Sequence, residues 1–270
     1  MPKVCLVTGA SAGIGRATAL ELLKAGYLVY GAARRVSKMD ELRAAGGRPL
    51  AMDARSEAGL DRAVRTVLDE QGRIDVLINN AGTVLHGAAE DVPLAAARDQ
   101  FQVNVFAPAR LVQLVLPAMR AQGSGRIVNV SSIGGEISLP LGSWYYASKH
   151  ALEAYSDTLR MEVRPFGIEV VVIQPGIIKT EFEDQTASQL REYSGNGPYG
   201  HMAEAMASKS ETGLSDGTDP AVVAETIRRA VEADPPETRY AVGLHAEELL
   251  KLNRTLPDRD FDELVTRSIR

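Results

Sequence analysis

Residues 4–15 of the chain read VCLVTGASAGIG, a short apolar run that leads directly into a glycine-rich turn. An apolar run of this length, bounded by glycine, is typical of a buried strand. The residues after the turn, from about 14 to 25, have a helical pattern that ends at Gly26, and a second apolar run covers residues 28–32. A strand, a glycine-rich turn, a helix and another strand within about thirty residues predict a unit that binds a dinucleotide.

The turn has its glycines at Gly9, Gly13 and Gly15, in the spacing Gly-x-x-x-Gly-x-Gly. Small residues allow the backbone to approach a pyrophosphate closely, and the N-terminus of the next helix offers N–H donors and the positive end of its dipole. A glycine-rich turn without a ligand would have the same composition, so the turn alone leaves both interpretations open.

Apolar runs and helical patterns alternate along the rest of the chain. Further strands are predicted at residues 48–52, 75–78, 127–131, 168–174 and 239–242, and further helices at 56–70, 94–121, 144–163 and 220–233. This alternation predicts an α/β fold with a Rossmann-type, doubly wound parallel sheet of about seven strands and helices on both faces. We expect a single domain over residues 1–270, in which 181–218 form a lid over the substrate and 245–270 form a helical tail.

A second motif surrounds Tyr145 and Lys149, which are four residues apart. On a helix this spacing places both side chains on one face. A nearby ammonium favours the phenolate form and lowers the pKa of a tyrosine from its ordinary value of about 10. The pair therefore predicts a proton donor and acceptor near neutral pH. Ser132 lies at the end of the strand predicted at 127–131, where its hydroxyl can share one carbonyl oxygen with the tyrosine.

Two neighbouring residues are alternatives for these roles. Tyr146 is adjacent to Tyr145, but the residue four positions after it is His150 rather than a lysine. Ser131 is adjacent to Ser132 and ends the same predicted strand.

Together with Asn79-Asn80-Ala81-Gly82 in the middle of the chain, these motifs stand in the order found in the short-chain dehydrogenase/reductase family. The chain resembles that family over nearly all of residues 1–245, and within it looks like NADP-dependent members such as hydroxysteroid dehydrogenase-like carbonyl reductases. The resemblance implies hydride transfer between a nicotinamide and a carbonyl or secondary alcohol, without a metal. The catalytic residues that it implies are Asn104, Ser132, Tyr145 and Lys149.

The resemblance also implies a role for each of these residues. Tyr145 is the general acid and base, and Ser132, favoured over Ser131, orients the substrate oxygen. Asn104 distorts its helix and holds a water that links Lys149 to solvent. A core amide whose hydrogen bonds are satisfied is the alternative role for Asn104.

The tip of the second strand reads Ala32-Ala33-Arg34-Arg35. A site for NAD has an acidic residue about 20 residues after the glycines, where it binds the ribose 2′-hydroxyl. No carboxylate stands at this tip, and Arg34 can hold a 2′-phosphate through paired hydrogen bonds, so we expect NADP(H). Exposed arginines that only cap a strand are the alternative. The residues that this argument and the resemblance place against the cofactor are Gly9, Ser11, Ala12, Gly13, Ile14, Gly15, Arg34, Arg35, Asp53, Ala54, Asn80, Ala81, Gly82, Tyr145, Lys149, Pro175, Gly176, Ile178 and Thr180.

Apolar residues surround the predicted catalytic groups and offer few hydrogen-bond partners, so a sugar would leave its hydroxyls unpaired there. We therefore expect a medium-sized, largely apolar carbonyl compound or alcohol as substrate. The residues expected to contact it are Ser132, Val84, Leu139, Trp144, Tyr145 and Phe182.

Composition excludes several other classes of protein. The formal net charge is −5 and no basic cluster is evident, which argues against a nucleic-acid partner. The single cysteine, Cys5, excludes an internal disulfide and suits a cytoplasmic location. No stretch approaches the ~20 apolar residues of a membrane span, and the histidines are too dispersed for a metal site. Apolar and small residues on several faces of the helices at 94–121 and 144–163 predict a homodimer or homotetramer.

Two other functions remain alternatives on the same fold. A sensor could bind NADP(H) without turnover, because a fold does not by itself define an activity. Sugar epimerases and dehydratases share the Tyr-x-x-x-Lys pair, but they usually have a longer C-terminal substrate domain and a Gly-x-x-Gly-x-x-Gly turn, which this chain lacks.

Overall fold

The computed structural model describes residues 2–180, 184–267 and 269 of the 270-residue chain. Within these residues, seven parallel strands form one sheet in the order β3-β2-β1-β4-β5-β6-β7. The strands are β1 (Val4–Thr8), β2 (Leu28–Ala33), β3 (Arg48–Ala51), β4 (Val76–Asn79), β5 (Gly125–Val130), β6 (Ile168–Pro175) and β7 (Arg239–Val242). This strand order is that of a doubly wound dinucleotide-binding sheet, so the predicted fold class is confirmed.

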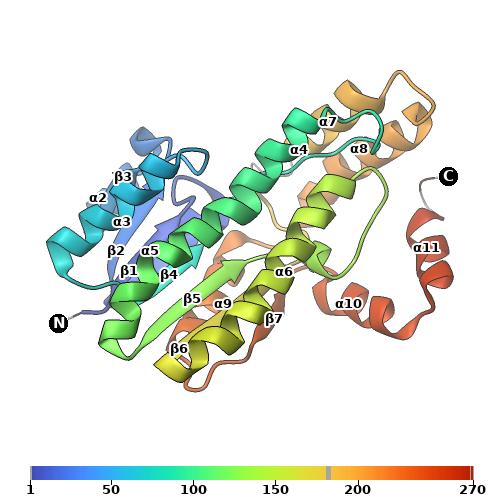
Figure 1. Ribbon diagram of the computed structural model, residues 1–270. Helices are drawn as coiled ribbons and strands as arrows, with labels where there is room; N and C mark the ends of the chain where they lie inside the picture. Colours follow the sequence, from blue (N-terminus) through green and yellow to red (C-terminus); the bar gives the residue numbers. More distant parts are fainter. Residues whose placement is uncertain (1, 181–183, 268, 270) are drawn as a thin grey trace.

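Helices cover both faces of the sheet (Figure 1). One face packs against α1 (Gly13–Lys24), α2 (Asp40–Ala44) and α9 (Pro220–Glu232). The other face packs against α3 (Glu57–Gln71), α5 (Ala107–Gln122) and α6 (Ser143–Val163). The described chain also contains α4 (Leu94–Phe101), α7 (Asp184–Ser194), α8 (Gly200–Asp216), α10 (Ala246–Thr255) and α11 (Asp258–Thr266).

Strand β1 shows why an uninterrupted apolar run was needed at this position. Val4 and Leu6 pack into the cluster on the α3–α5–α6 side, whereas Cys5 and Val7 pack into the cluster on the α1–α9 side. Successive side chains of a strand point to opposite faces, and both faces are covered here, so every position has to be apolar.

The predicted elements agree closely with the observed ones. The strand predicted at 239–242 is β7, and the Oγ of Ser56 caps α3 by accepting a hydrogen bond of 3.1 Å from Gly59 N. The helix predicted at 94–121 is divided by a π-helical segment at Gln102–Phe106. The short helix α2 was not predicted, because five residues are fewer than the window in which a helical period can be recognised.

The predicted lid and the predicted C-terminal tail are both helical, as expected. Residues of the predicted lid form α7 and α8, and the tail forms α10 and α11, which separate at Pro257. Figure 1 shows α10 and α11 at the end of the sheet that carries β7, away from β1, β2 and β3. The tail therefore lies beside the half of the sheet that does not form the dinucleotide-binding unit.

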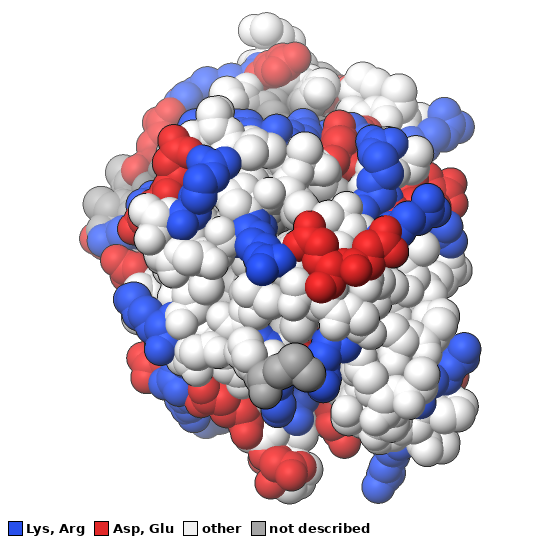
Figure 2. Space-filling model, turned by 90° about the vertical axis from the view of Figure 1, so that its left-hand side faces the viewer, with Lys and Arg blue, Asp and Glu red and all other residues white. Residues whose placement is uncertain are grey.

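Charged side chains of both signs are interspersed on the molecular face shown in Figure 2. Among the described residues on this face, Lys and Arg do not gather into one continuous area of the kind that a phosphate backbone requires. None of the helices in the described part of the chain combines the length and apolarity needed to cross a bilayer.

Candidate active site

The glycine-rich turn lies against the loop that follows β4. Gly9 and Gly13 have φ angles of +71° and +52°, which side chains other than glycine rarely adopt. A Cβ at Gly9 would lie 2.7 Å from Asn80 Nδ2, and a Cβ at Gly15 would collide with the same amide and with the Gly9 carbonyl. The turn thus needs glycine both for its conformation and for the close approach of residue 80.

Thr8 and Asn80 hold these two segments together. The Thr8 hydroxyl donates to Ile78 O and accepts from the backbone N–H groups of Asn80 and Ala81, at 3.0 and 2.9 Å. Asn80 Nδ2 in turn donates to Thr8 O at 2.9 Å. Residues 8–15 and 79–82 therefore form one rigid rim at the carboxyl edge of the sheet, which is where ligands bind in open α/β sheets.

A cavity of about 660 Å³ opens at this edge. It brings together most of the residues that the sequence predicted for the cofactor, the chemistry and the substrate. Those residues are Gly9, Ser11, Ala12, Gly13, Ile14, Arg34, Arg35, Asp53, Ala54, Asn80, Ala81, Gly82, Val84, Ser132, Leu139, Tyr145, Lys149, Pro175, Gly176, Ile178 and Thr180. Gly15 and Asn104 lie behind its wall, and Phe182 lies outside the described residues.

Lys149 and Tyr145 project from the first turns of α6. The Lys149 side chain is buried, and its Nζ lies 6.0 Å from the centre of the Tyr145 ring and donates to Val130 O at 3.1 Å. Burial lowers the pKa of Lys149 from 10.5 to about 8, while the negative charge of Glu153 acts in the opposite direction. The ammonium is therefore the main form of Lys149 at neutral pH.

Ser132 follows the end of β5 by two residues and lines the cavity. Its Oγ accepts a hydrogen bond of 3.0 Å from Gly134 N and donates a long one of 3.5 Å to Pro175 O. The Oγ of the alternative, Ser131, is buried without a hydrogen-bond partner among the described residues. Of the two hydroxyls, that of Ser132 has the geometry to exchange its weak bond for a substrate oxygen.

Tyr146, the alternative to Tyr145, is packed between two glycines. A Cβ at Gly134 would lie 2.9 Å from the Tyr146 ring, and a Cβ at Gly142 would collide with it. The rings of Tyr145 and Tyr146 meet edge to face at 5.4 Å. Tyr146 thereby fixes the loop between Ser132 and α6. The ammonium of Lys149 lies near the ring of Tyr145.

Asn104 lies in the π-helical segment, so the expected distortion of the helix is present at this residue. Its side-chain amide pairs with both backbone groups of Thr83, accepting from N at 2.9 Å and donating to O at 3.0 Å. It also donates to Ser148 Oγ at 3.1 Å, and that hydroxyl donates to Tyr145 O. Asn104 therefore connects the loop after β4 to the first turn of the helix that carries Tyr145.

Trp144, a predicted substrate contact, is not among the described residues that line the cavity. Its side chain packs against the buried cluster of Leu85, Val92 and Ala97, and its ring meets that of Phe101 at 6.4 Å. Adjacent residues on a helix point about 100° apart, so a neighbour of Tyr145 in sequence need not face the same space. Trp144 belongs to the packing of α6 against α4.

His86 also lines the cavity, although the sequence assigns it no role. Its ring lies 5.8 Å from that of Tyr145, and burial lowers its pKa to about 4, opposed by a hydrogen bond with the Leu141 backbone. The imidazole is therefore neutral at physiological pH. Its position shortly after a strand end at the carboxyl edge of the sheet was the available signal.

The predicted lid is attached to the loop that carries His86. Gln189 of α7 accepts from His86 N at 3.0 Å and donates to Val84 O at 3.2 Å, and Ser194 Oγ accepts from Ala88 N at 2.8 Å. Gln185, Thr186 and Met206 of α7 and α8 line the cavity. Residues of the predicted lid thus form part of the cavity wall.

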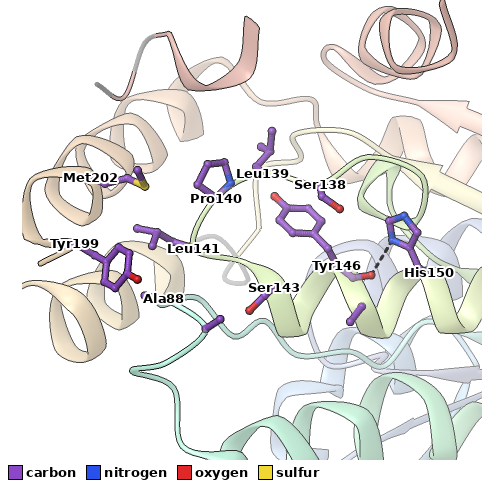
Figure 3. A pocket seen from close by; sticks show the side chains of 12 residues that line it. Ala88, Ser138, Leu139, Pro140, Leu141, Ser143, Tyr146, His150, Tyr199 and Met202 are labelled. Carbon is purple, nitrogen blue, oxygen red and sulfur yellow. Dashed lines mark hydrogen bonds between the residues drawn. The ribbon is translucent and has the colours of Figure 1, made fainter. Parts of the chain in front are cut away.

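A second cavity of about 590 Å³ shares Leu139, Pro140 and Tyr146 with the first. Figure 3 shows Tyr199, just before α8, and Met202 of α8 facing these residues across it. Among the residues that the structure describes, no three histidine, cysteine or carboxylate side chains gather as a metal site requires. Catalysis without a metal stays a prediction.

A doubly wound sheet whose glycine-rich turn shares a cavity with a serine, a tyrosine and a lysine defines a class of nicotinamide-dependent oxidoreductases. The family model described as short chain dehydrogenase matches residues 3–191. The chain therefore belongs to the short-chain dehydrogenase/reductase family, and it is an oxidoreductase that acts on carbonyl or alcohol groups with a nicotinamide dinucleotide.

Three relatives illustrate this membership. The chain is 36% identical to 3-ketodihydrosphingosine reductase of Bacteroides thetaiotaomicron, with 95% of this chain and 94% of the relative covered. It is 30% identical to the NADPH-dependent 3-dehydrocapnine reductase of Ornithobacterium rhinotracheale, with 99% and 98% covered. A short-chain dehydrogenase of Streptomyces avermitilis has the same fold, with a TM-score of 0.82, 35% identity and 100% and 97% of the two chains covered.

Proposed function

We propose that this protein is an NADP(H)-dependent enzyme that interconverts a medium-sized, largely apolar ketone or aldehyde and its alcohol, with Tyr145 as general acid and base. The observation that carries the proposal is that the same cavity is lined by the glycine-rich turn, Arg34, Ser132, Tyr145 and Lys149. Bound there, the nicotinamide supplies or accepts the hydride.

In the reductive direction, the Tyr145 hydroxyl donates a proton to the oxygen of the substrate carbonyl as negative charge develops on it. The Ser132 hydroxyl gives up its long bond to Pro175 O and donates to the same oxygen, which orients the carbonyl. The Lys149 ammonium stabilises the phenolate that remains on Tyr145. In the oxidative direction the tyrosine accepts the proton of the alcohol.

Asn104 supports this constellation from behind the cavity wall. Through Thr83 and Ser148 it fixes the loop after β4 relative to the first turn of α6. The π-helical turn around it also displaces backbone carbonyls from the regular helical ladder. This is consistent with the proposed water that would replenish the proton of the tyrosine through Lys149.

Preference for NADP(H) rests on the tip of β2. Arg34 is exposed and lines the cavity, and the residues at positions 32–35 include no acidic side chain. A guanidinium recognises a phosphate through paired hydrogen bonds, whereas a carboxylate here would repel it. One relative is named as an NADPH-dependent reductase, which supports this proposal.

The apolar side of the cavity supports the proposed class of substrate. Val84, Ile137, Leu139 and Met206 line it, and a polyhydroxylated ligand would lose hydrogen bonds to water there without replacement. Two relatives are named as reductases of 3-ketodihydrosphingosine and 3-dehydrocapnine, which supports a ketone as the oxidised substrate.

The test is an NADPH-depletion screen over ketones, aldehydes, quinones and steroids, with the corresponding alcohols and NADP⁺ in the reverse direction. We expect turnover of apolar carbonyl compounds in preference to sugars. Tight NADPH binding without turnover of any compound would instead favour the sensor. We also propose a cytoplasmic location, supported by the single, buried cysteine, which fractionation of the native cells would check.

A further inference from the structure

The C-terminal helices return to the cavity that holds Ser132 and Tyr145. Val265 of α11 and Ile269 after it line this cavity, although both are more than 100 residues away from Tyr145 in sequence. We propose that α10 and α11 form the far wall of the substrate cavity and that Val265 and Ile269 select substrates with an extended apolar group beyond the reacting carbonyl. This inference rests on the proposed function of the cavity.

Polar contacts attach α10 to the segment that follows Ser132. Arg254 donates to both carboxylate oxygens of Glu136 at 2.9 and 2.8 Å, and Asn253 Nδ2 donates to Glu136 O at 3.0 Å. Gln174 of β6 donates to the same carboxylate at 2.7 Å. Burial opposes ionisation of Glu136, but the hydrogen bonds from Gln174 and Arg254 lower its pKa overall, so it stays an anion for Arg254.

Apolar packing continues this attachment toward the cavity. Ile137, Leu250 and Phe261 form a buried cluster, and Ile133 and Val265 pack against it. Ile133, Ile137 and Val265 also line the cavity. One apolar surface therefore runs from the loop after Ser132 across to α11, and it is built from segments on both sides of the site.

One face of α11 contributes to the cavity wall, and the opposite face is turned to the solvent. Phe261 and Val265 are four residues apart and lie on the inner face, whereas Leu264 is 40% exposed on the outer face. A substitution at Leu264 therefore replaces an aliphatic residue of the same helix whose side chain does not line the cavity. It is a matched control for a substitution at Val265.

The position of this wall defines the class of ligand. Ser132 and Tyr145 hold the oxygen of the carbonyl at one end, and the remainder of the substrate extends along Ile137 toward Val265. Burial of one methylene group improves binding by about fourfold. We therefore expect ketones with a longer straight or alicyclic apolar group to be preferred over short ones.

The experiment compares Val265→Trp, Leu264→Trp and the wild type on straight-chain 2-ketones from butan-2-one to decan-2-one, with NADPH. In the wild type, kcat/KM should rise with chain length. Val265→Trp should lower kcat/KM for decan-2-one at least about tenfold more than for butan-2-one, mainly through KM, because the indole occupies the space for the last methylene groups. Leu264→Trp should keep the wild-type dependence on length. Equal losses for both ketones in Val265→Trp, or no loss for either, would overturn the proposal.

Binding of the same ketones to the complex with NADP⁺, measured by calorimetry, separates this inference from the proposed function. Affinity that rises with chain length and is lost in Val265→Trp supports the wall even if no ketone is reduced, in which case the proposed function fails alone. Affinity independent of chain length in the wild type overturns the wall alone. Val265→Ala removes apolar contact and adds no bulk, so it should weaken decan-2-one binding several-fold. It replaces Val265→Trp in the test if the tryptophan variant does not fold.

Discussion

Glu153 lies four residues after Lys149 on α6, and its buried carboxylate accepts hydrogen bonds from Gln174 Nε2 at 3.1 Å and from Arg239 Nε at 3.0 Å. This carboxylate raises the pKa of Lys149 against the larger lowering effect of burial. It also packs against Gly135, where a Cβ would lie 2.6 Å from Glu153 Cγ. The charge of Lys149 near neutral pH therefore depends on a residue beneath the loop that carries Ser132.

Replacing Glu153 by glutamine should shift the pH dependence of turnover. The ammonium form of Lys149 supports Tyr145, and this form is lost as pH rises through a pKa of about 8. Without the negative charge that pKa falls further, so activity should begin to decline at a lower pH. The measurement is kcat against pH from about 6 to 10. Glu162→Gln, an exposed change on the same helix, is the control, and identical profiles for both variants and the wild type would contradict the prediction.

Tyr145→Phe should abolish turnover while NADPH affinity changes little. General acid–base catalysis typically contributes 10²–10⁴-fold, roughly, to an enzymatic rate. Tyr146→Phe is the matched control, because its ring packs between Gly134 and Gly142 and the substitution keeps that ring. Steady-state kinetics and NADPH fluorescence titration give the two quantities. A Tyr145→Phe rate within about tenfold of the wild type would remove Tyr145 from the mechanism.

Arg34→Ala should raise the KM for NADPH and leave that for NADH nearly unchanged, since only NADPH carries the 2′-phosphate that the guanidinium would bind. Arg43→Ala is a suitable control, because Arg43 is an exposed arginine of α2 that pairs with Asp40. The measurement is the KM of each variant for NADPH and for NADH at saturating ketone. Equal effects of Arg34→Ala on NADPH and NADH would refute the phosphate contact.

The sequence predicted the sheet, its helices and most cavity residues because these depend on local signals. A strand buried on both faces needs an apolar run such as Val4–Val7, and a turn with positive φ angles needs glycine at Gly9 and Gly13. Long-range packing was not accessible in the same way. Trp144 and Tyr145 are neighbours in sequence, but Trp144 packs against the cluster beside α4 whereas Tyr145 lines the cavity, and this difference depends on where α4 lies.

The contribution of the tail to the cavity was inaccessible for a related reason. The helical period of α11 identifies an apolar face at Phe261 and Val265, but not the partner of that face. Only the fold shows that Ile133 and Ile137, which follow Ser132, cover it. His86 was missed because a single histidine in a loop carries no spacing that could be compared with a function.

His86 should make the protein less stable in mild acid. Its pKa is about 4 in the folded chain and near 6.5 when unfolded, so between these values the unfolded state binds more protons and stability falls as pH falls. The full effect is about 3 kcal/mol in the free energy of unfolding. Urea denaturation of the wild type and His86→Gln from pH 7.5 to pH 4 measures it. The variant should lose less stability over this range, and parallel curves would contradict the prediction.

We propose that the chain assembles as a homodimer or homotetramer. Phe106, the last residue of the π-helical segment before α5, is 56% exposed, and Met161, near the end of α6, is 67% exposed. Large apolar side chains on the outer side of a helical layer are typical of a surface that another copy of the chain covers. Sedimentation at micromolar concentration should show a dimer or tetramer, and Phe106→Lys combined with Met161→Lys should shift it toward monomer. Leu264→Lys, at an exposed leucine of α11, should leave the assembly unchanged. A monomeric wild type would contradict the proposal.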